Sequence, residues 1–86
     1  QRGGKKNFEP FLVSMDDVSE VFPIFSHPGE EFIYLLSGKL TYRHGNQTYA
    51  MDVGDSLTFD AEIPHGPELL EEVPIKLLSI IHYNDE

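Results

Sequence analysis

Short apolar runs separated by turn residues are the feature that most limits how this chain can fold. Strand-forming residues alternate with polar ones at 40–43, 48–51 and 56–59. Glycine, asparagine or aspartate stands between these runs, as in hairpins. No ten-residue window carries a helical period of apolar residues. The pattern therefore predicts an all-β fold, a sandwich or barrel of antiparallel strands.

Four more apolar runs extend this pattern to both ends of the chain. Residues 7–15 are expected to form a first strand, whose proline favours a position near the edge of the sheet. A second run, at 21–26, is interrupted by another proline. The aromatic and branched run at 32–36 is bounded by turn residues, and Gly38 is expected to end it in a turn. Residues 74–83 are expected to form a last strand that is buried on both faces.

The size and composition of the chain limit what can stabilise it. With 86 residues, it has about the minimum material for one independent core, to which ten aromatic residues contribute. The absence of cysteine excludes disulfides and thiolate zinc sites and favours a cytoplasmic location. No signal peptide is visible, and no apolar run approaches the roughly 18 residues of a membrane span. Stability must then come from packing, a bound metal or a partner subunit.

The charge is distributed unevenly along the chain. All fifteen acidic residues follow residue 6, whereas three of the six basic ones precede residue 7. Residues 7–86 thus carry a formal charge of −12 and are expected to repel nucleic acid. The first six residues are basic, contain two glycines and do not begin with methionine. We interpret residues 1–6 as a flexible basic linker and the sequence as a fragment of a longer protein.

Two side chains of the type that binds metals lie four positions apart, at His27 and Glu31. A helix would bring them to one face, but Pro28 and Gly29 disfavour a helix there. We expect a tight bend that enters a strand, with both side chains able to point to one side. A third ligand type, His65, also stands where a strand begins or ends. Imidazole and carboxylate groups at the ends of strands indicate a candidate metal site.

Together, His27, Glu31 and Gly38, followed by Gly54 and His65, resemble the two motifs of the cupin superfamily. The first motif reads His-x-His, three or four residues, Glu, six residues, Gly. The second motif reads Gly, five residues, Pro-x-Gly, two residues, His, three residues, Asn. The five residues match at the family's spacings. The resemblance implies one small antiparallel β-barrel of the jelly-roll type over residues 7–86.

The departures from these motifs bear on the ligand set. Phe25 stands at the first histidine of the first motif and cannot bind a metal. The resemblance thus leaves His27, Glu31 and His65, a facial set with open positions that is typical of non-haem iron. Some cupins, notably those similar to hydroxypropylphosphonate epoxidase, use such a set; others with eroded motifs hold no metal and bind small molecules. Asp60, Glu62 and Leu69 replace the Pro, Gly and Asn of the second motif.

We therefore expect a divalent metal, either iron, manganese, zinc or nickel, at His27, Glu31 and His65. The other two histidines, His44 and His82, are interpreted as a loop residue and as a core or surface residue. No catalytic residue is assigned.

The amino-acid sequence around the two motifs is most similar to that of the C-terminal cupin domains of bacterial helix-turn-helix transcription regulators. That resemblance implies a sensor domain that binds a small-molecule effector in the barrel. We also expect a homodimer, because so small a barrel buries little apolar surface and its terminal strands offer edges; the run at 8–13 is the candidate pairing strand. DNA would then be bound by another domain. The alternative is a metal-dependent cupin enzyme, a non-haem iron oxygenase or epoxidase, or an isomerase, for which the sequence supplies no obvious general base. A third reading is a metal-free structural module for dimerisation.

Overall fold

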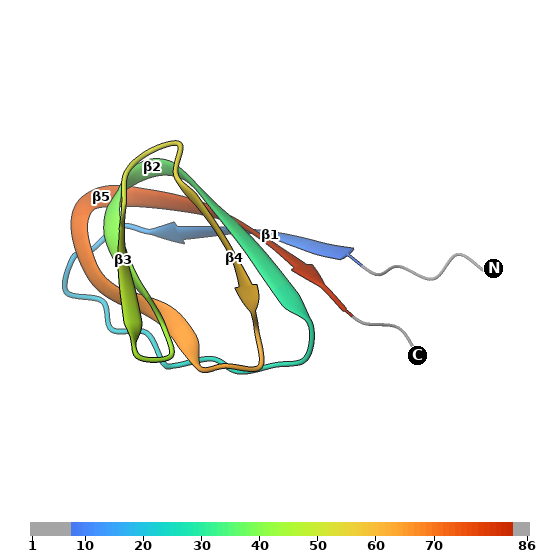
Figure 1. Ribbon diagram of the computed structural model, residues 1–86. Coiled ribbons are helices and arrows are strands. Elements are labelled where there is room, and N and C mark those ends of the chain that lie inside the picture. Colours follow the sequence, from blue (N-terminus) through green and yellow to red (C-terminus); the bar gives the residue numbers. More distant parts are fainter. Residues whose placement is uncertain (1–7, 84–86) are drawn as a thin grey trace.

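The computed structural model describes residues 8–83, which form five strands and no helix (Figure 1). The all-β prediction is therefore confirmed. Among these residues there is no helix of the length and apolar character needed to cross a membrane. The predicted linker at 1–6 lies outside the described residues. The strands are β1 (Phe8–Met15), β2 (Glu30–His44), β3 (Gln47–Met51), β4 (Ser56–Asp60) and β5 (His65–His82).

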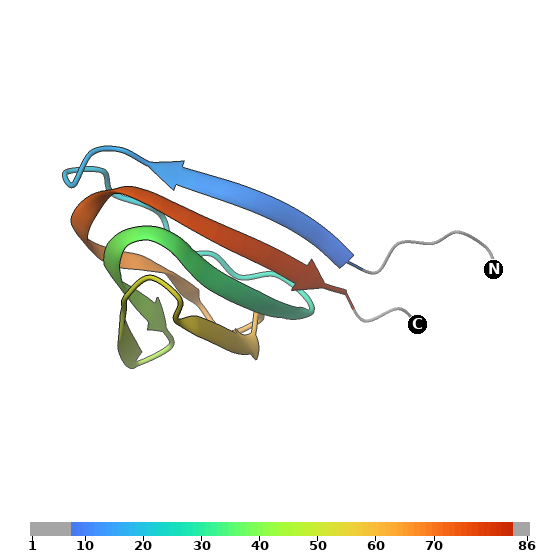
Figure 2. The same ribbon diagram turned by 90° about the horizontal axis from the view of Figure 1, so that it is seen from above.

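All five strands belong to one antiparallel sheet, in the order β1-β5-β2-β3. The long strands β2 and β5 pair along almost their whole length, and β3 and β4 share the other edge of β2. β4 pairs with 30–34, and β3 pairs with 40–44. β2 and β5 curve together between these two parts, so that the sheet folds over on itself (Figures 1 and 2).

The bend of β2 lies around Gly38, where the pairing with β5 shifts register several times. Before the bend, the buried positions of β2 are odd-numbered, as at Ile33 and Leu35; after it they are even-numbered, as at Leu40 and Tyr42. Bulges of this kind add twist and change which face a side chain occupies. Both halves of β2 can therefore point their apolar residues into the same interior.

The predicted turn at Gly38 is wrong, because Gly38 lies inside β2 with a φ of 89°. A positive φ at glycine serves a bulge as well as a turn, and the residue type does not distinguish the two. The backbone of β5 also approaches closely here. A Cβ atom at this position would lie 2.5 Å from the carbonyl oxygen of Glu72 and 2.7 Å from that of Pro74.

The predicted closed barrel is also wrong, because the sheet stays open. Over residues 8–83, β1 pairs only with β5 and β3 pairs only with β2, so the two ends of the sheet do not meet. The apolar run at 21–26 forms no strand and contributes one bridge, between Phe25 and His65. Pro23 and Pro28, which lack a backbone N–H, flank that bridge and limit further pairing.

The core lies between the two halves of the folded sheet. On the last part of β5, burial alternates: Ile75, Leu77 and Ser79 are buried, whereas Leu78 and Ile80 are half-buried. The prediction of a strand buried on both faces is thus wrong, since one face points outward. The buried core residues are Met15, Ile33, Leu35, Leu40, Tyr42, Met51, Leu70, Ile75 and Leu77.

Candidate metal centre

The three predicted ligands come from three separate places in the fold. His27 lies in the loop before β2, Glu31 is the second residue of β2, and His65 is the first residue of β5. The His27 loop is fixed by a hydrogen bond from the His27 amide to the carbonyl of Ala61, at 3.0 Å. His65 exchanges two backbone hydrogen bonds with Phe25, at 2.7 and 2.9 Å. These contacts tie the loop that carries His27 to the segment between the end of β4 and the start of β5.

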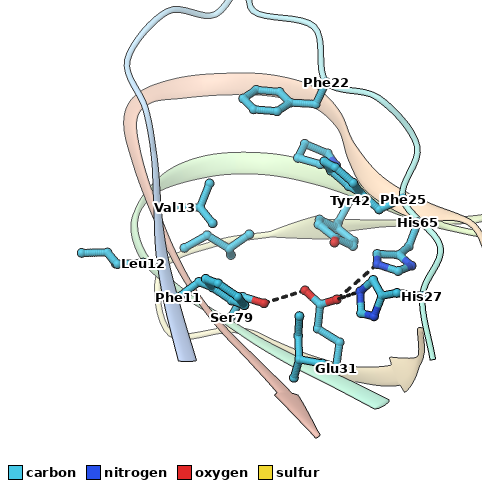
Figure 3. Close-up of a pocket in the computed structure, with 13 residues that line it drawn as sticks. Phe11, Leu12, Val13, Phe22, Phe25, His27, Glu31, Tyr42, His65 and Ser79 are labelled. Carbon is cyan, nitrogen blue, oxygen red and sulfur yellow. Dashed lines mark hydrogen bonds and ion pairs between the residues drawn. The ribbon is translucent and has the colours of Figure 1, made fainter. Parts of the chain in front are cut away.

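The candidate ligand atoms converge on one oxygen of Glu31. The Nε2 atoms of His27 and His65 each lie 3.1 Å from Glu31 Oε1 (Figure 3). One ligand atom from each of the three residues can be chosen so that all lie within 4.8 Å of one another. Ligands about 2.0–2.2 Å from an ion, on adjacent corners of an octahedron, are separated by roughly 3 Å. The two 3.1 Å separations from Glu31 Oε1 match this spacing, so the cluster could hold one metal ion.

The second nitrogen of each histidine ring is occupied by a backbone carbonyl. His65 Nδ1 lies 2.9 Å from the carbonyl oxygen of Ile63, and His27 Nδ1 lies 3.2 Å from that of Pro28. A carbonyl can only accept, so each Nδ1 carries a proton and donates it. In a neutral imidazole the lone pair then resides on Nε2. In the metal-free protein each Nε2 donates to the Glu31 carboxylate; once that proton is lost, each ring would present the Nδ1–H tautomer that binds metals, held by a second contact as in known metal sites.

Ser79 is a contributor to the site that the sequence reading missed. Its hydroxyl donates a 2.6 Å hydrogen bond to Glu31 Oε2, which leaves Oε1 directed at the two histidines. Ser79 lies on β5 and is buried. It is a polar residue at an inward-facing position between apolar neighbours, Leu77 and Ile81. A polar residue at an inward-facing position of an apolar strand was the sequence signal that could have identified Ser79 as part of the site.

The site is largely shielded from solvent. The side chains of His65 and Glu31 are 2% and 9% exposed, and that of His27 is 25% exposed. Burial raises the pKa of Glu31, but hydrogen bonds from His65, Ser79 and His27 outweigh it, so the pKa lies below its usual value. Burial lowers the pKa of His65, but its hydrogen bonds to Glu31 and Ile63 outweigh that effect and raise it. The carboxylate therefore stays ionised, as a metal ligand requires.

The three residues stand in the wall of a cavity of about 500 Å³. Most of the lining is apolar and includes Phe11, Val13, Phe22, Leu77 and Ile81. The polar lining consists of the three candidate ligands with Tyr42 and Ser79, and no lysine or arginine of the described chain lines the cavity. A volume of this size suits a small organic molecule.

Outside the ligand cluster lie three further residues considered above, Phe25, His44 and His82. Phe25, at the position of the first motif histidine, lines the cavity with its ring 6.4 Å from that of His65. His44 is no loop residue: it ends β2, and its Nε2 lies 3.0 Å from the carbonyl oxygen of Asp60. His82 stacks on Phe8 with 4.8 Å between the ring centres. Neither His44 nor His82 belongs to the cluster.

Several solved structures have the same fold. A conserved protein of unknown function from Streptococcus pyogenes is 22% identical with a TM-score of 0.79, over 96% of this chain and 70% of that one. An HTH_3 family transcriptional regulator from Vibrio cholerae is 21% identical with a TM-score of 0.78, over 92% of this chain and 44% of that one. The iron(II) form of HppE in complex with substrate is 22% identical with a TM-score of 0.71, over 87% of this chain and 45% of that one.

These identities are low, so the structural similarity shows the fold alone. Among curated proteins, none matches the sequence significantly. The sequence profile described as "Cupin domain", in contrast, matches residues 12–81. That match spans all five strands except the start of β1 and the last residue of β5. The chain belongs to the cupin domain family.

Proposed function

We propose that this chain is the effector-binding cupin domain of a bacterial helix-turn-helix transcription regulator, with a divalent metal at His27, Glu31 and His65. The observation that carries the proposal is an apolar cavity of about 500 Å³ whose wall contains the three ligand-type side chains. The likeness in fold to the Vibrio cholerae regulator supports the placement in a regulator. Such a domain would act in the cytoplasm.

The metal part of the proposal rests on the donor set. Two imidazoles and one carboxylate on one side of an ion leave coordination positions open toward the cavity. Iron, manganese, zinc and nickel all accept these donors, and the donors alone do not choose among them.

Metal uptake tests this part of the proposal. After loading with each ion and desalting, elemental analysis is expected to give one ion per chain, and His65→Ala is expected to abolish uptake. His82→Ala is the matched control, because His82 lies outside the cluster and stacks on Phe8. Uptake that is equal in wild type and His65→Ala would reject the site.

The regulator part of the proposal predicts that DNA binding and effector binding belong to different domains of the natural chain. Residues 7–86 carry a formal charge of −12, which opposes binding to a phosphate backbone. In a gel-shift experiment, the natural full-length chain is expected to bind operator fragments that were selected with that chain. Residues 7–86 alone are expected to show none, even at low salt, where electrostatic attraction is strongest. If the natural chain carries no DNA-binding domain, the regulator proposal fails.

Dimer formation would suit this role, since paired helix-turn-helix domains read two-fold operators. The outer edge of β1 has no partner strand among residues 8–83, and we propose it as the pairing edge. An effector in the cavity would change DNA binding only by favouring one of two dimer geometries over the other.

A metal-dependent enzyme is the second candidate, an oxygenase or epoxidase with non-haem iron, or an isomerase. It is favoured by the two-His-one-Glu set and by the likeness in fold to HppE. The described lining holds no further carboxylate, lysine or histidine to act as a general base. Dioxygen consumption by the iron(II)-loaded protein with an organic substrate would favour an oxygenase or epoxidase, whereas an effector domain returns its ligand unchanged. A metal-free structural module is disfavoured, because it needs no open cavity.

A further inference from the structure

The hydroxyl of Tyr42 is a buried polar group that the fold itself does not satisfy. Tyr42 is 3% exposed and lines the cavity. Within residues 8–83, no group forms a hydrogen bond with its hydroxyl, although Ser79, His27 and His65 in the same cavity all have partners. Buried hydroxyls without partners are destabilising and rare. A ligand that accepts a hydrogen bond from Tyr42 would account for its presence.

The position of Tyr42 relates it directly to the candidate metal centre. It lies on β2 beyond the bend from Glu31, so that the folded sheet brings both side chains into one interior. Its ring packs 5.7 Å from that of Phe59, which in turn lies 4.9 Å from the ring of His65. Figure 3 shows the hydroxyl pointing into the cavity, on the side where Glu31 and His65 meet. Burial and the nearby charge of Glu31 raise the pKa of Tyr42, so it stays neutral and can donate.

The charge of the cavity limits what the ligand can be. A divalent ion with Glu31 and two neutral imidazoles has a net charge of +1, and no other charged residue of the described chain lines the cavity. An uncompensated charge in an apolar cavity is unfavourable. One negative charge on the ligand makes the site neutral, whereas a neutral ligand leaves +1 and a doubly charged one leaves −1.

The shape of the cavity limits the rest of the ligand. Away from the metal ligands, the wall is formed by apolar side chains, including Phe11, Val13 and Phe22. These residues favour a hydrocarbon or aromatic body over a sugar or a phosphate ester.

We propose that Tyr42 donates a hydrogen bond to a singly charged, apolar organic acid whose carboxylate occupies the open side of the metal centre. The inference rests on the proposed metal-dependent ligand binding and names the ligand class and a further residue that recognises it. Tyr42 is then a specificity-determining residue as well as a core residue.

The test uses the cobalt(II)-loaded protein, whose visible absorption responds to ligands on the metal, together with calorimetry. Three probes of similar shape separate the charge states: benzamide is neutral, benzoate carries one negative charge and phthalate carries two. Benzoate is expected to bind most tightly and to change the cobalt spectrum. Tyr42→Phe is expected to weaken benzoate binding about 10- to 100-fold, as for a hydrogen bond to a charged group, without changing cobalt affinity. Tyr49→Phe, at an exposed position of β3 outside the cavity lining, is the matched control.

A purely structural tyrosine would give a different pattern. In the ligand-free protein, Tyr42→Phe is expected to preserve or raise the thermal midpoint, because it removes an unsatisfied hydroxyl. Equal benzoate affinity in wild type and Tyr42→Phe would overturn the role of Tyr42 while leaving ligand binding intact. Equal affinity for benzamide and benzoate would overturn the charge argument. If cobalt binds but no probe does, the ligand class is overturned and the metal site stands; failure to take up cobalt rejects both.

Discussion

Ser79 orients the carboxylate on which both histidines converge. Its hydrogen bond holds Glu31 Oε2, so that Oε1 remains available to the proposed metal. Removing contacts of this kind commonly costs 10- to 100-fold in metal affinity. We expect Ser79→Ala to weaken metal binding by about that factor without unfolding the protein, as measured by calorimetric titration with nickel or cobalt. Ser56→Ala, an exposed serine of β4, is the control and should leave the affinity unchanged.

The buried Glu31–His65 pair predicts how the stability of the metal-free protein depends on pH. The pKa of Glu31 lies below its ordinary value of 4.5, so its stabilising effect is complete above pH 4.5 and is lost as the pH falls through the folded-state value. The pKa of His65 lies above its ordinary value of 6.5, so its effect is complete below pH 6.5 and is lost as the pH rises through the folded-state value. The pair should therefore stabilise the fold most between pH 4.5 and 6.5.

Urea unfolding in the presence of a chelator measures this effect. Glu31→Gln removes the ionisable partner and keeps the size of the side chain. The difference in unfolding midpoint between wild type and Glu31→Gln should be largest between pH 4.5 and 6.5 and should shrink on both sides. A difference that does not vary with pH would show that the ion pair contributes nothing to stability.

At the scale of strands, the bend of β2 depends on Gly38. A side chain there would meet the carbonyl oxygens of Glu72 and Pro74 in addition to the strain of a positive φ. Gly54 also has a positive φ, 95°, but no atom lies within 4 Å of the position of its Cβ. We expect Gly54→Ala to cost about 1–2 kcal/mol in free energy of unfolding and Gly38→Ala about 3 kcal/mol or more. If chemical denaturation gives the same loss of free energy of unfolding for both variants, the close approach of the β5 carbonyls adds no cost at Gly38.

Local patterns in the sequence predicted the strands, whereas features that depend on the bend could not be predicted. Each hairpin strand was recognisable because its alternation and its turn lie within a few residues. The spacing of His27, Glu31 and His65 was informative because it matches a family pattern that encodes their meeting in space. Ser79 and the role of Tyr42 depend on register shifts between β2 and β5, which a single sequence does not display. Closure of the barrel depends on pairing between distant segments, which local pattern does not determine either.

Part of the outward face of the sheet, between Glu30 and Lys76, is an uncharged strip on an acidic protein. Leu12, Leu78 and Tyr34 are cross-strand neighbours there, and a second row joins Pro10, Ile80 and Phe32. A second copy of the chain would meet less charge repulsion on these rows than elsewhere, which supports dimerisation through β1 and its neighbours.

Light scattering tests this arrangement at tens of micromolar protein. Wild type is expected to be a dimer, and Leu12→Lys is expected to be a monomer, because it places a charge on the proposed interface. Val53→Lys is the matched control: both side chains are 60% exposed, but Val53 lies in the turn between β3 and β4. Monomeric wild type, or a Leu12→Lys variant that remains dimeric, would contradict the assignment of this interface.

The position of β1 also has a consequence for how fast molecules exchange. Phe11 and Val13 form part of the cavity wall, yet over residues 8–83 the strand that carries them is hydrogen-bonded on one side only (Figure 2). Edge strands open locally at a lower free-energy cost than central ones, and their amides exchange hydrogen faster. Opening of β1 would therefore shorten the residence time of a bound molecule. Association of two copies along this strand would lengthen that time without adding a contact to the ligand.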